Sequence, residues 1–252
     1  MLQERREKIV EMLNADKIVK VNELVQIFGV SIETIRRDLE YLEQQGFLNR
    51  VYGGALPAQR KALEPTYMTR EIAHYEEKKR IGRRAAELVR DGEVLAIDIG
   101  TTTLEFAKAL VGNKKVTVIT NSMKIAMVLS EDRDIEVIML GGSVRSGEFS
   151  VSGSLANQNT GLFNTDKLFL GVGGLTIEKG ITDYHAEESN LRRHTIQNTQ
   201  KVIALADYSK FGIVAMNKVC DLTRVDVLVT DDKVSGDIVK QLMDMELEVI
   251  LV

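Results

Sequence analysis

Short runs of apolar, largely β-branched residues dominate the last two thirds of the chain. They lie at 94–99, 116–120, 135–140, 167–170, 201–206, 225–229 and 247–252. Apolar runs without alternation indicate strands buried on both faces, as in a parallel sheet covered by helices. The stretches between them, for example 103–111 and 122–129, have helical spacing. The pattern predicts an open, mostly parallel α/β sheet that binds ligands at the carboxyl ends of its strands.

The first sixty residues differ, because their apolar residues recur only at helical spacing. This spacing predicts helices at 2–13, at 21–28 and from Ser31 onward. The residues predicted to face inward are Ile9, Met12, Leu13, Leu24, Ile27, Phe28, Ile32, Ile35, Leu39 and Leu42. The opposite side of the third helix carries Glu33, Thr34, Arg37 and Tyr41, with Arg36 at the border.

A tight turn joins the second and third predicted helices. Gly29 suits a left-handed helix end, and the Ser31 hydroxyl can cap the next helix. Two short helices joined in this way, at about 20–39, are typical of a helix-turn-helix, whose second helix can enter a major groove. Residues 47–55 then suggest a strand and a glycine turn, as a β wing requires. The alternative is a small helical interaction domain with solvated arginines.

The prolines divide the chain. Pro57 and Pro65 are the only two, and the segment between them is polar. Since proline fixes φ and removes a backbone donor, helices and strands rarely run through such a pair. We therefore predict a first domain at 1–57, a linker at 58–75 and a second domain at 76–252.

Composition narrows the class of protein further. The 252 residues carry a net charge of −4, so binding to nucleic acid by bulk charge is not expected. One cysteine excludes an internal disulfide framework, and the three histidines lack metal-site spacing. No apolar run is long enough to span a bilayer, and the N-terminus is charged where a signal peptide would be apolar. We expect a cytoplasmic protein with no membrane, metal or cofactor requirement.

A spaced motif in the first domain resembles that of a known family. Its positions are Arg5, Ile9, Leu13, Ser31, Thr34, Ile35, Arg36, Arg37, Asp38 and Leu39. Together with Arg50-Val51-Tyr52-Gly53-Gly54-Ala55, they resemble the DeoR family of bacterial winged helix-turn-helix regulators, although a histidine is commoner at the position of Tyr52. The resemblance extends to the order of a regulator head followed by an α/β sensor domain. It implies operator double-stranded DNA as a partner.

The side-chain chemistry of the head residues suggests which of them would contact bases and which would contact phosphates. Arginine can bond guanine edges in pairs, while serine and threonine contact bases or phosphates. We predict base contacts from Thr34 and Arg37, with Arg36 sharing that role or holding phosphate. Ser31 is predicted to cap its helix and touch phosphate, and Arg50 and Tyr52 to act as wing contacts. Asp38 is better suited to orient an arginine, because phosphate repels a carboxylate.

In the second domain, Asp98-Ile99-Gly100-Thr101-Thr102-Thr103 follows an apolar run and opens a helix. A helix start offers free N–H groups and the positive end of the helix dipole to an anion. The alternative is a plain helix cap. The segment lacks the lysine of a nucleotide triphosphate loop and the dinucleotide glycine fingerprint.

Other polar groups follow the neighbouring strands. They are Asn121 within Thr120-Asn121-Ser122, Gly141, Gly142 and Arg145 after the third run, Gly173 after the fourth, and Lys210 after the fifth. Taken singly, each is a turn. Together they suit a phosphorylated sugar or polyol. The set resembles the DeoR-type sensor domain, itself similar to ribose-5-phosphate isomerase. That resemblance implies a phosphate loop at Gly100 to Thr103 and sugar-phosphate contacts from Lys210 and Arg145.

An isomerase would need a carboxylate base near the sugar. The segment 170–174, where such isomerases carry acidic residues, has none, and Glu187 and Glu188 are interpreted as helix-dipole partners. Arg192 stands where many relatives have lysine. We therefore expect no enzyme but a repressor of a carbohydrate operon, modulated by a phosphorylated sugar. The alternatives are a sugar-phosphate isomerase with a regulatory head and a protein–protein adaptor.

One winged helix contacts only one half-site, and operator symmetry usually mirrors protein symmetry. We therefore expect a homodimer or homotetramer held by the α/β domain or the linker. The effector response is predicted to pass through Thr66 to Arg84, which carries the cluster Lys78-Lys79-Arg80. The alternative interpretation of that cluster is a solvated helix face.

Overall fold

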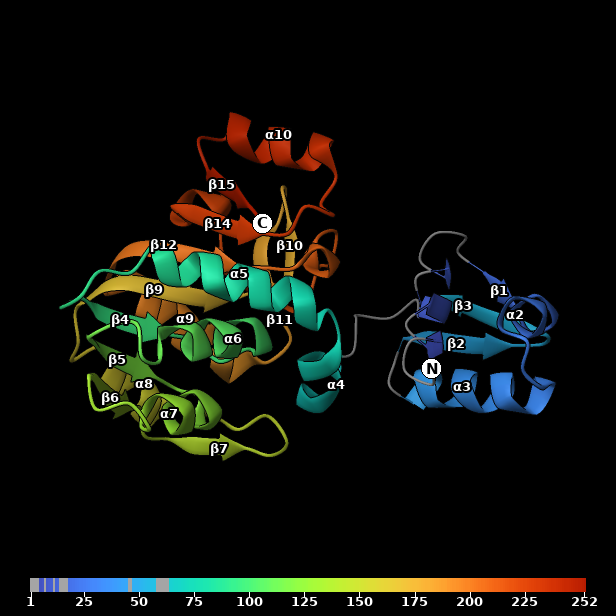
Figure 1. The fold of residues 1–252 in the computed structure, drawn as a ribbon, viewed down its shortest axis with the longest axis horizontal. Helices are drawn as coiled ribbons and strands as arrows, with labels where there is room; N and C mark the ends of the chain where they lie inside the picture. The colour runs from blue at the N-terminus through green and yellow to red at the C-terminus, as the bar shows by residue number, and fades with distance from the viewer. Residues whose placement is uncertain (1–4, 7, 11, 14–17, 45–46, 58–63) are drawn as a thin grey trace. The chain divides into compact units, whose positions relative to one another are not determined.

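The chain folds into two compact units, Met1–Thr69 and Arg70–Val252. The structure is a computed structural model that describes residues 5–6, 8–10, 12–13, 18–44, 47–57 and 64–252. Each unit has its own hydrophobic core and is described by itself (Figure 1).

The smaller unit is a winged helix. Helical residues 5–6, 8–10 and 12–13 precede β1 (Val19–Lys20), α2 (Val21–Phe28), α3 (Ile32–Gln44), β2 (Leu48–Val51) and β3 (Gly54–Pro57). The three strands pair antiparallel in the order β1-β3-β2. Gly29 ends α2 with a φ of 62°, and Gly53 has a φ of 80° between β2 and β3. Both predicted glycine turns therefore form where left-handed backbone is needed.

The core of this unit joins the first helix to α2, α3 and the sheet. Its buried side chains are Ile9, Leu13, Val19, Leu24, Ile35, Leu39, Leu42, Leu48 and Ala55. The prediction was wrong for Ile27 and Ile32, which are 55% and 45% exposed. Ile27 lies off the side of α2 that Leu24 and Phe28 define, and Ile32 begins α3 with no preceding helical turn to pack beside it. Leu2, the predicted first residue of the first helix, lies outside the described residues.

The larger unit is built on one parallel sheet of seven strands. They are β4 (Val94–Ile97), β5 (Val116–Thr120), β6 (Ile135–Met139), β9 (Thr165–Gly171), β12 (Thr199–Leu205), β14 (Val227–Thr230) and β15 (Glu248–Leu251). Their order is β15-β14-β12-β9-β4-β5-β6, and every neighbouring pair is parallel. Each predicted apolar run supplies one strand, so the expected α/β fold with a mostly parallel sheet is confirmed.

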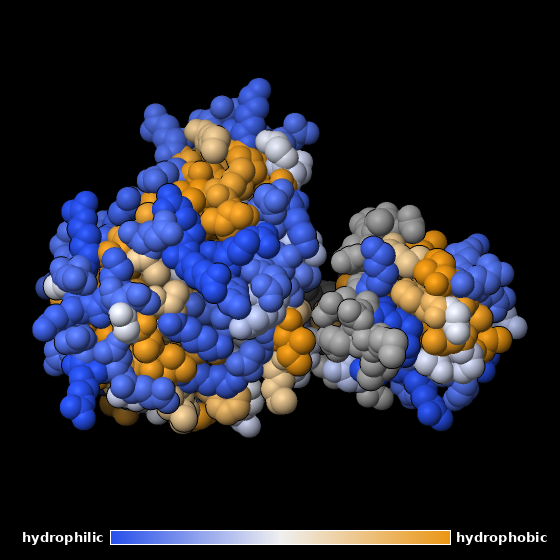
Figure 2. Space-filling model, in the orientation of Figure 1, coloured by the Kyte–Doolittle hydropathy of each residue, from blue (hydrophilic) through white to orange (hydrophobic). Residues whose placement is uncertain are grey.

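Helices cover both faces of this sheet. The helices α5 (Tyr75–Glu87), α6 (Thr101–Leu110) and α7 (Met123–Leu129) lie on one face, and α9 (Ala186–Gln197) and α10 (Gly236–Asp244) pack on the other. Strand residues alternate between the two cores: Phe169 stacks on Phe106 of α6 with ring centroids 3.9 Å apart, while Leu168 and Leu170 face the other side. Figure 2 shows hydrophilic side chains over much of the visible surface of this unit, as amphipathic covering helices require.

Smaller elements extend from the carboxyl ends of the strands. The strands β7 (Ser143–Arg145) and β8 (Ser150–Ser152) form a separate hairpin, followed by α8 (Ser154–Thr160). The strands β10 (Gly174–Thr176), β11 (Gly180–Asp183) and β13 (Asn217–Cys220) form a second antiparallel sheet. Among the described residues, no helix has the length and apolarity that crossing a membrane would require.

The segment predicted as a linker, 58–75, contains regular structure. Helix α4 (Tyr67–Ile72) lies within it, and the Thr66 hydroxyl accepts a hydrogen bond from the N–H of Thr69 at 3.3 Å. This hydroxyl cap permits a helix directly after Pro65. Residues 58–63 lie outside the described part of the chain.

Candidate nucleic-acid interface and effector site

The outward side of α3 carries the polar residues expected to face DNA. Ser31 Oγ accepts a hydrogen bond from the N–H of Thr34 at 3.2 Å, which confirms its predicted capping role. Arg36 and Arg37 are exposed, and Arg37 Nε lies 3.8 Å from Glu33 Oε1. Ile35 is fully buried on the opposite side. The helix therefore presents one polar side outward, as a recognition helix does.

Asp38 of the same helix points inward. It is 1% exposed and accepts hydrogen bonds from Arg5 Nε at 2.6 Å and Arg6 Nε at 2.8 Å. The Arg6 guanidinium also lies 3.8 Å from the centre of the Tyr41 ring. The prediction that Asp38 orients an arginine is confirmed, and these arginines come from the first helix. The carboxylate thus fixes the first helix against α3.

The wing is held to α3 by a second acid–base contact. Arg50 donates through its backbone N–H at 2.8 Å and its Nε at 2.7 Å to the Glu43 carboxylate. These two donors hold the pKa of Glu43 below its usual value. Tyr52 is fully exposed in the turn between β2 and β3. The wing therefore offers an aromatic side chain at its tip and an arginine tied to the recognition helix.

In the larger unit, the predicted effector residues follow five adjacent strands. The segments after β4, β5, β6, β9 and β12 all emerge at the same edge, because the strands are parallel and neighbours in the sheet. The structure therefore brings the predicted segments to one edge. It also shows what several of these residues do within the fold.

The predicted phosphate loop lies at the start of α6. Gly100 precedes the helix, and the Thr103 hydroxyl donates to the Gly100 carbonyl at 3.0 Å. Thr101 and Thr102 are buried, at 8% and 6% exposure. Asn121 Oδ1 accepts from the N–H of Ile99 at 3.0 Å and so ties the loop to the end of β5.

Asp98 is the centre of a buried ionic network. Its Oδ2 accepts from Arg192 Nε at 2.6 Å and from the N–H of Gly171 at 3.2 Å, while Arg192 also pairs with Asp183. Burial raises the pKa of Asp98 to about 6 although Arg192 opposes that shift. The network joins the ends of β4, β9 and β11 to α9. This structural use of Asp98 was not predicted, because Arg192 lies far away in the sequence.

Two of the predicted glycines are required by close packing. A Cβ on Gly173 would lie 2.5 Å from Asp183 Oδ1, and a Cβ on Gly142 would lie 2.5 Å from the Ser152 carbonyl oxygen. Gly142 also has a φ of 144°. Gly141 has more space, since its Cβ would approach only Asn159 Nδ2, at 3.4 Å. Glycine at 142 and 173 therefore serves the fold whether or not a ligand approaches.

Lys210 lies in a charged cluster beyond β12. Asp207 is fully buried, and burial would raise its pKa, but the ammonium groups of Lys210 and Lys78 outweigh that effect and lower it. Lys78 is 1% exposed and donates to the carbonyls of Ala73, at 2.6 Å, and Arg70. Lys78 therefore bonds carbonyls at and just beyond the end of α4. The alternative of a solvated helix face is wrong for Lys78.

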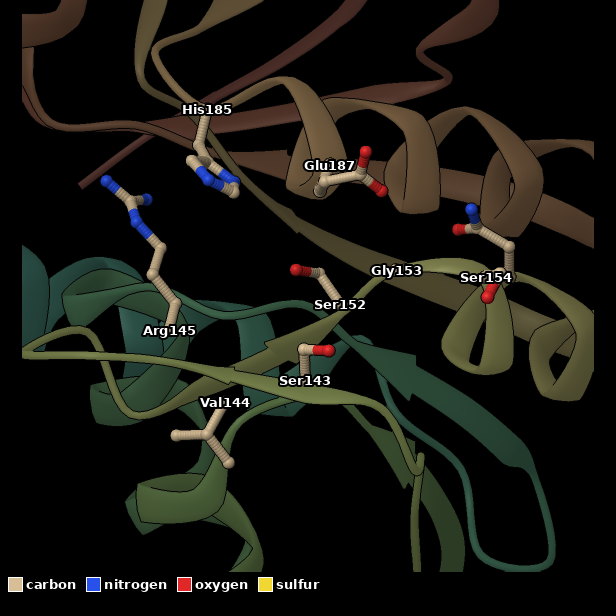
Figure 3. Close-up of a pocket in the computed structure, with 9 residues that line it drawn as sticks. Ser143, Val144, Arg145, Ser152, Gly153, Ser154, His185 and Glu187 are labelled. Carbon is tan, nitrogen blue, oxygen red and sulfur yellow. The ribbon is translucent and has the colours of Figure 1, made fainter.

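An open pocket of about 580 Å³ lies between the β7–β8 hairpin and the starts of α8 and α9 (Figure 3). Its lining residues are Ser143, Val144, Arg145, Ser152, Gly153, Ser154, Asn157, His185 and Glu187. Arg145 alone of these was a predicted effector residue, and its Nη1 pairs with Glu188 Oε2 at 3.0 Å. Glu188 is 3% exposed and also accepts from Ser150 Oγ at 2.5 Å, so its carboxylate does more than complement a helix dipole. The remaining lining was missed, although the serine- and glycine-rich segment 141–154 could have indicated it.

Within the described residues, no cluster of three or more histidine, cysteine, aspartate or glutamate side chains is arranged to hold a metal ion.

The fold and the two candidate sites define a class of protein, a winged-helix head followed by an open α/β domain with polar strand ends. The chain belongs to the DeoR family of transcriptional regulators, since residues 5–61 match the DeoR-like helix-turn-helix domain and residues 73–232 match the DeoR C terminal sensor domain.

Full-length relatives have the same arrangement. The chain is 32% identical to the glycerol-3-phosphate regulon repressor of Escherichia coli K12, over 97% of each sequence. It is 36% identical to the HTH-type transcriptional repressor GlcR of Bacillus subtilis 168, over 91% of this chain and 88% of that protein. Among solved structures, ribose 5-phosphate isomerase A of Methanocaldococcus jannaschii matches 55% of each chain with a TM-score of 0.41 and 18% identity.

The buried Lys78 makes stability depend on pH. Burial lowers its pKa to about 8 from 10.5, so between these values the unfolded chain binds more protons at this site. Stability from this group therefore rises with pH across that window, by roughly 3 kcal/mol in total. We expect the unfolding free energy of the wild type, relative to that of Lys78→Met, to rise between pH 8 and pH 10.5. Urea unfolding followed by circular dichroism measures both free energies. Lys79→Met is the matched control, and parallel curves for wild type and Lys78→Met would contradict the assignment.

Proposed function

We propose that this protein is a repressor of a carbohydrate-metabolism operon whose operator binding is modulated by a phosphorylated sugar or polyol. The observation that carries the proposal is the exposure of Arg36 and Arg37 on α3, beside Ser31 at its start and the half-buried Thr34, while Ile35, Leu39 and Leu42 of the same helix are buried. Membership of the family supports it, as do relatives named as repressors, one of them of a glycerol-3-phosphate regulon.

On DNA, the proposed division of work follows side-chain chemistry. Thr34 and Arg37 would contact base edges, Arg36 a base or a phosphate, and Ser31 a phosphate beside its cap. The exposure of both arginines supports these assignments. Arg50 and Tyr52 would contact the backbone or minor groove from the wing.

The proposed effector site lies at the carboxyl edge of the parallel sheet. The phosphate would lie at Gly100 to Thr103, at the start of α6, where backbone N–H groups and the helix dipole favour an anion. Asp98, Asn121, Gly141, Gly142, Gly173 and the cations Arg145 and Lys210 complete the proposed site.

We propose that the protein is not an enzyme. The segment 170–174 has no carboxylate, and the buried carboxylates of Asp98 and Glu188 are hydrogen-bonded to Arg192 and Arg145, which ties them to the fold rather than to a substrate. Turnover of pentose or hexose phosphates by the purified protein would favour the isomerase alternative. We expect the protein in the cytoplasm, beside its operator.

Replacing Arg37 tests the base contact. We expect Arg37→Ala to remove about 1–3 kcal/mol of discrimination between operator and unrelated DNA, because a paired bond to a base edge is lost. The fold should survive, since Arg37 lies outside the core of the head. Fluorescence anisotropy with both duplexes measures the ratio. Arg83→Ala removes an equal charge from an exposed site in the larger unit and should leave the ratio unchanged; an unchanged ratio for Arg37→Ala would refute the assignment.

Replacing Thr102 tests the phosphate loop. We expect Thr102→Glu to abolish the effector response while operator binding persists, because a carboxylate repels phosphate. Thr102→Val removes only the hydroxyl and should weaken effector binding in calorimetric titration. Thr117→Val, on β5, is the matched control. Undiminished affinity in both Thr102 variants would count against the loop.

Contacts around α4 support the proposed route for the effector response through Thr66 to Arg84. Arg70 pairs with Glu148 in the loop of the β7–β8 hairpin, and Lys78 binds the carbonyl of Arg70. A ligand that prefers one arrangement of these contacts could shift the head between states, whereas equal affinity would shift nothing.

We propose that the protein acts as a homodimer or homotetramer, because one winged helix reads only one half-site of a symmetric operator. Multi-angle light scattering at working concentration should therefore give at least twice the chain mass of 28.1 kDa. A monomer, both with and without operator DNA, would refute the proposal.

A further inference from the structure

The pocket between the β7–β8 hairpin and the starts of α8 and α9 is lined mainly by groups that form hydrogen bonds. Three serine hydroxyls, the Asn157 amide, the His185 ring and the Glu187 carboxylate contribute to its lining, beside the apolar side chain of Val144. In Figure 3, Arg145 and His185 extend toward each other from opposite sides, and Ser152 on the hairpin lies below Glu187 of α9. A ligand here would need many donors and acceptors rather than an apolar surface.

The charges of the lining make this pocket unsuitable for a phosphate group. Its cation, Arg145, is already neutralised by Glu188 at 3.0 Å. The Glu187 carboxylate also lines the pocket and would repel an anion. The lining therefore favours an uncharged ligand.

Two polar atoms of the pocket lining lack hydrogen-bond partners in the described part of the chain. The Nδ1 of His185 and the Oδ1 of Asn157 have no hydrogen-bond partner among the described residues. His185 stands at the N-cap of α9, yet its side chain makes no capping bond. Because buried polar groups are nearly always paired, these two lining side chains have unused hydrogen-bonding capacity, which a ligand would engage once the side chains turn toward the pocket.

Ionic contacts connect this pocket to the proposed phosphate loop. Asp183, two residues before His185, pairs with Arg192, which also holds Asp98 at the end of β4. Glu188, in the first turn of the helix that His185 precedes, holds Arg145 and the hairpin residue Ser150. Pocket and loop therefore belong to one bonded framework.

We propose that this pocket binds the uncharged, hydroxylated part of a hexose- or hexitol-sized effector, through Asn157 and His185. The inference rests on the proposed function and names the ligand class of that site. Each sugar hydroxyl donates and accepts, as the serine, amide and imidazole groups of the lining require. The pocket volume of about 580 Å³ falls within the range of small-molecule sites, and a triose-sized polyol would leave most of its groups unpaired.

The test is calorimetric titration of the full chain with inorganic phosphate, glycerol 3-phosphate, and the 6-phosphates of glucose, fructose, galactose and sorbitol. We expect at least one six-carbon phosphate to bind the wild type more tightly than glycerol 3-phosphate. His185→Ala should weaken that binding by about tenfold, which is about 1.4 kcal/mol and within the usual cost of one lost hydrogen bond. The affinity for inorganic phosphate should not change. His194→Ala, in the last turn of α9, is the matched control and should behave as the wild type.

Asn157→Ala repeats the test from the other side of the pocket, should His185→Ala fail to fold by circular dichroism. Unchanged six-carbon phosphate binding in the folded pocket variants would overturn the inference while leaving the proposed function intact. Equal binding of glycerol 3-phosphate and every six-carbon probe would overturn it too. Binding that is lost in Thr102→Val but kept in the pocket variants assigns recognition to the loop alone. If no phosphorylated probe binds the wild type, the effector half of the proposed function fails, and this inference with it.

Discussion

The proposed effector site depends on the buried pairing of Arg192 with Asp98 and Asp183, which holds the ends of β4 and β11 against α9. Burial alone would lower the pKa of Arg192, but Asp183, Asp98 and Glu188 outweigh it and raise that pKa, so the guanidinium stays charged. Removing one member of such a group strands a buried charge, which commonly costs 3–5 kcal/mol, about half the stability of a typical domain. Strand ends that the sheet hydrogen bonds alone would leave free are thereby fixed relative to α9.

In the winged-helix head, different residues of the motif build the fold and face outward. Of the motif residues, Ile9, Leu13, Ile35 and Leu39 form the core, and Arg5 holds Asp38. The remaining positions point outward from α3. A motif of this kind therefore encodes both a folded unit and the surface that it presents, and only the outward part can discriminate between DNA sequences.

Most of the architecture could be predicted from the sequence because it depends on local patterns. Seven apolar runs gave seven strands, and helical spacing gave the helix-turn-helix, since burial of one side is a property of neighbouring residues. The partners of Asp98 and the lining of the pocket come from segments far apart in the chain, which periodicity cannot pair. The errors at Ile27 and Ile32 arose where a helix is short or just beginning, so that spacing alone does not define a buried side. Helix α4 was missed because its hydroxyl cap lies directly after a proline.

The β7–β8 hairpin forms its own two-stranded sheet, outside the seven-stranded one. Its pocket-lining residues Ser143 and Val144 are exposed, so substitutions there would cost the scaffold little, whereas Ser150 and Val151 are buried and tie the hairpin to Glu188 and Asn121. During divergence, a duplicated copy of such a protein could acquire a new ligand preference through changes confined to this hairpin. The sheet and the recognition helix would then stay unchanged while the sensed molecule changes.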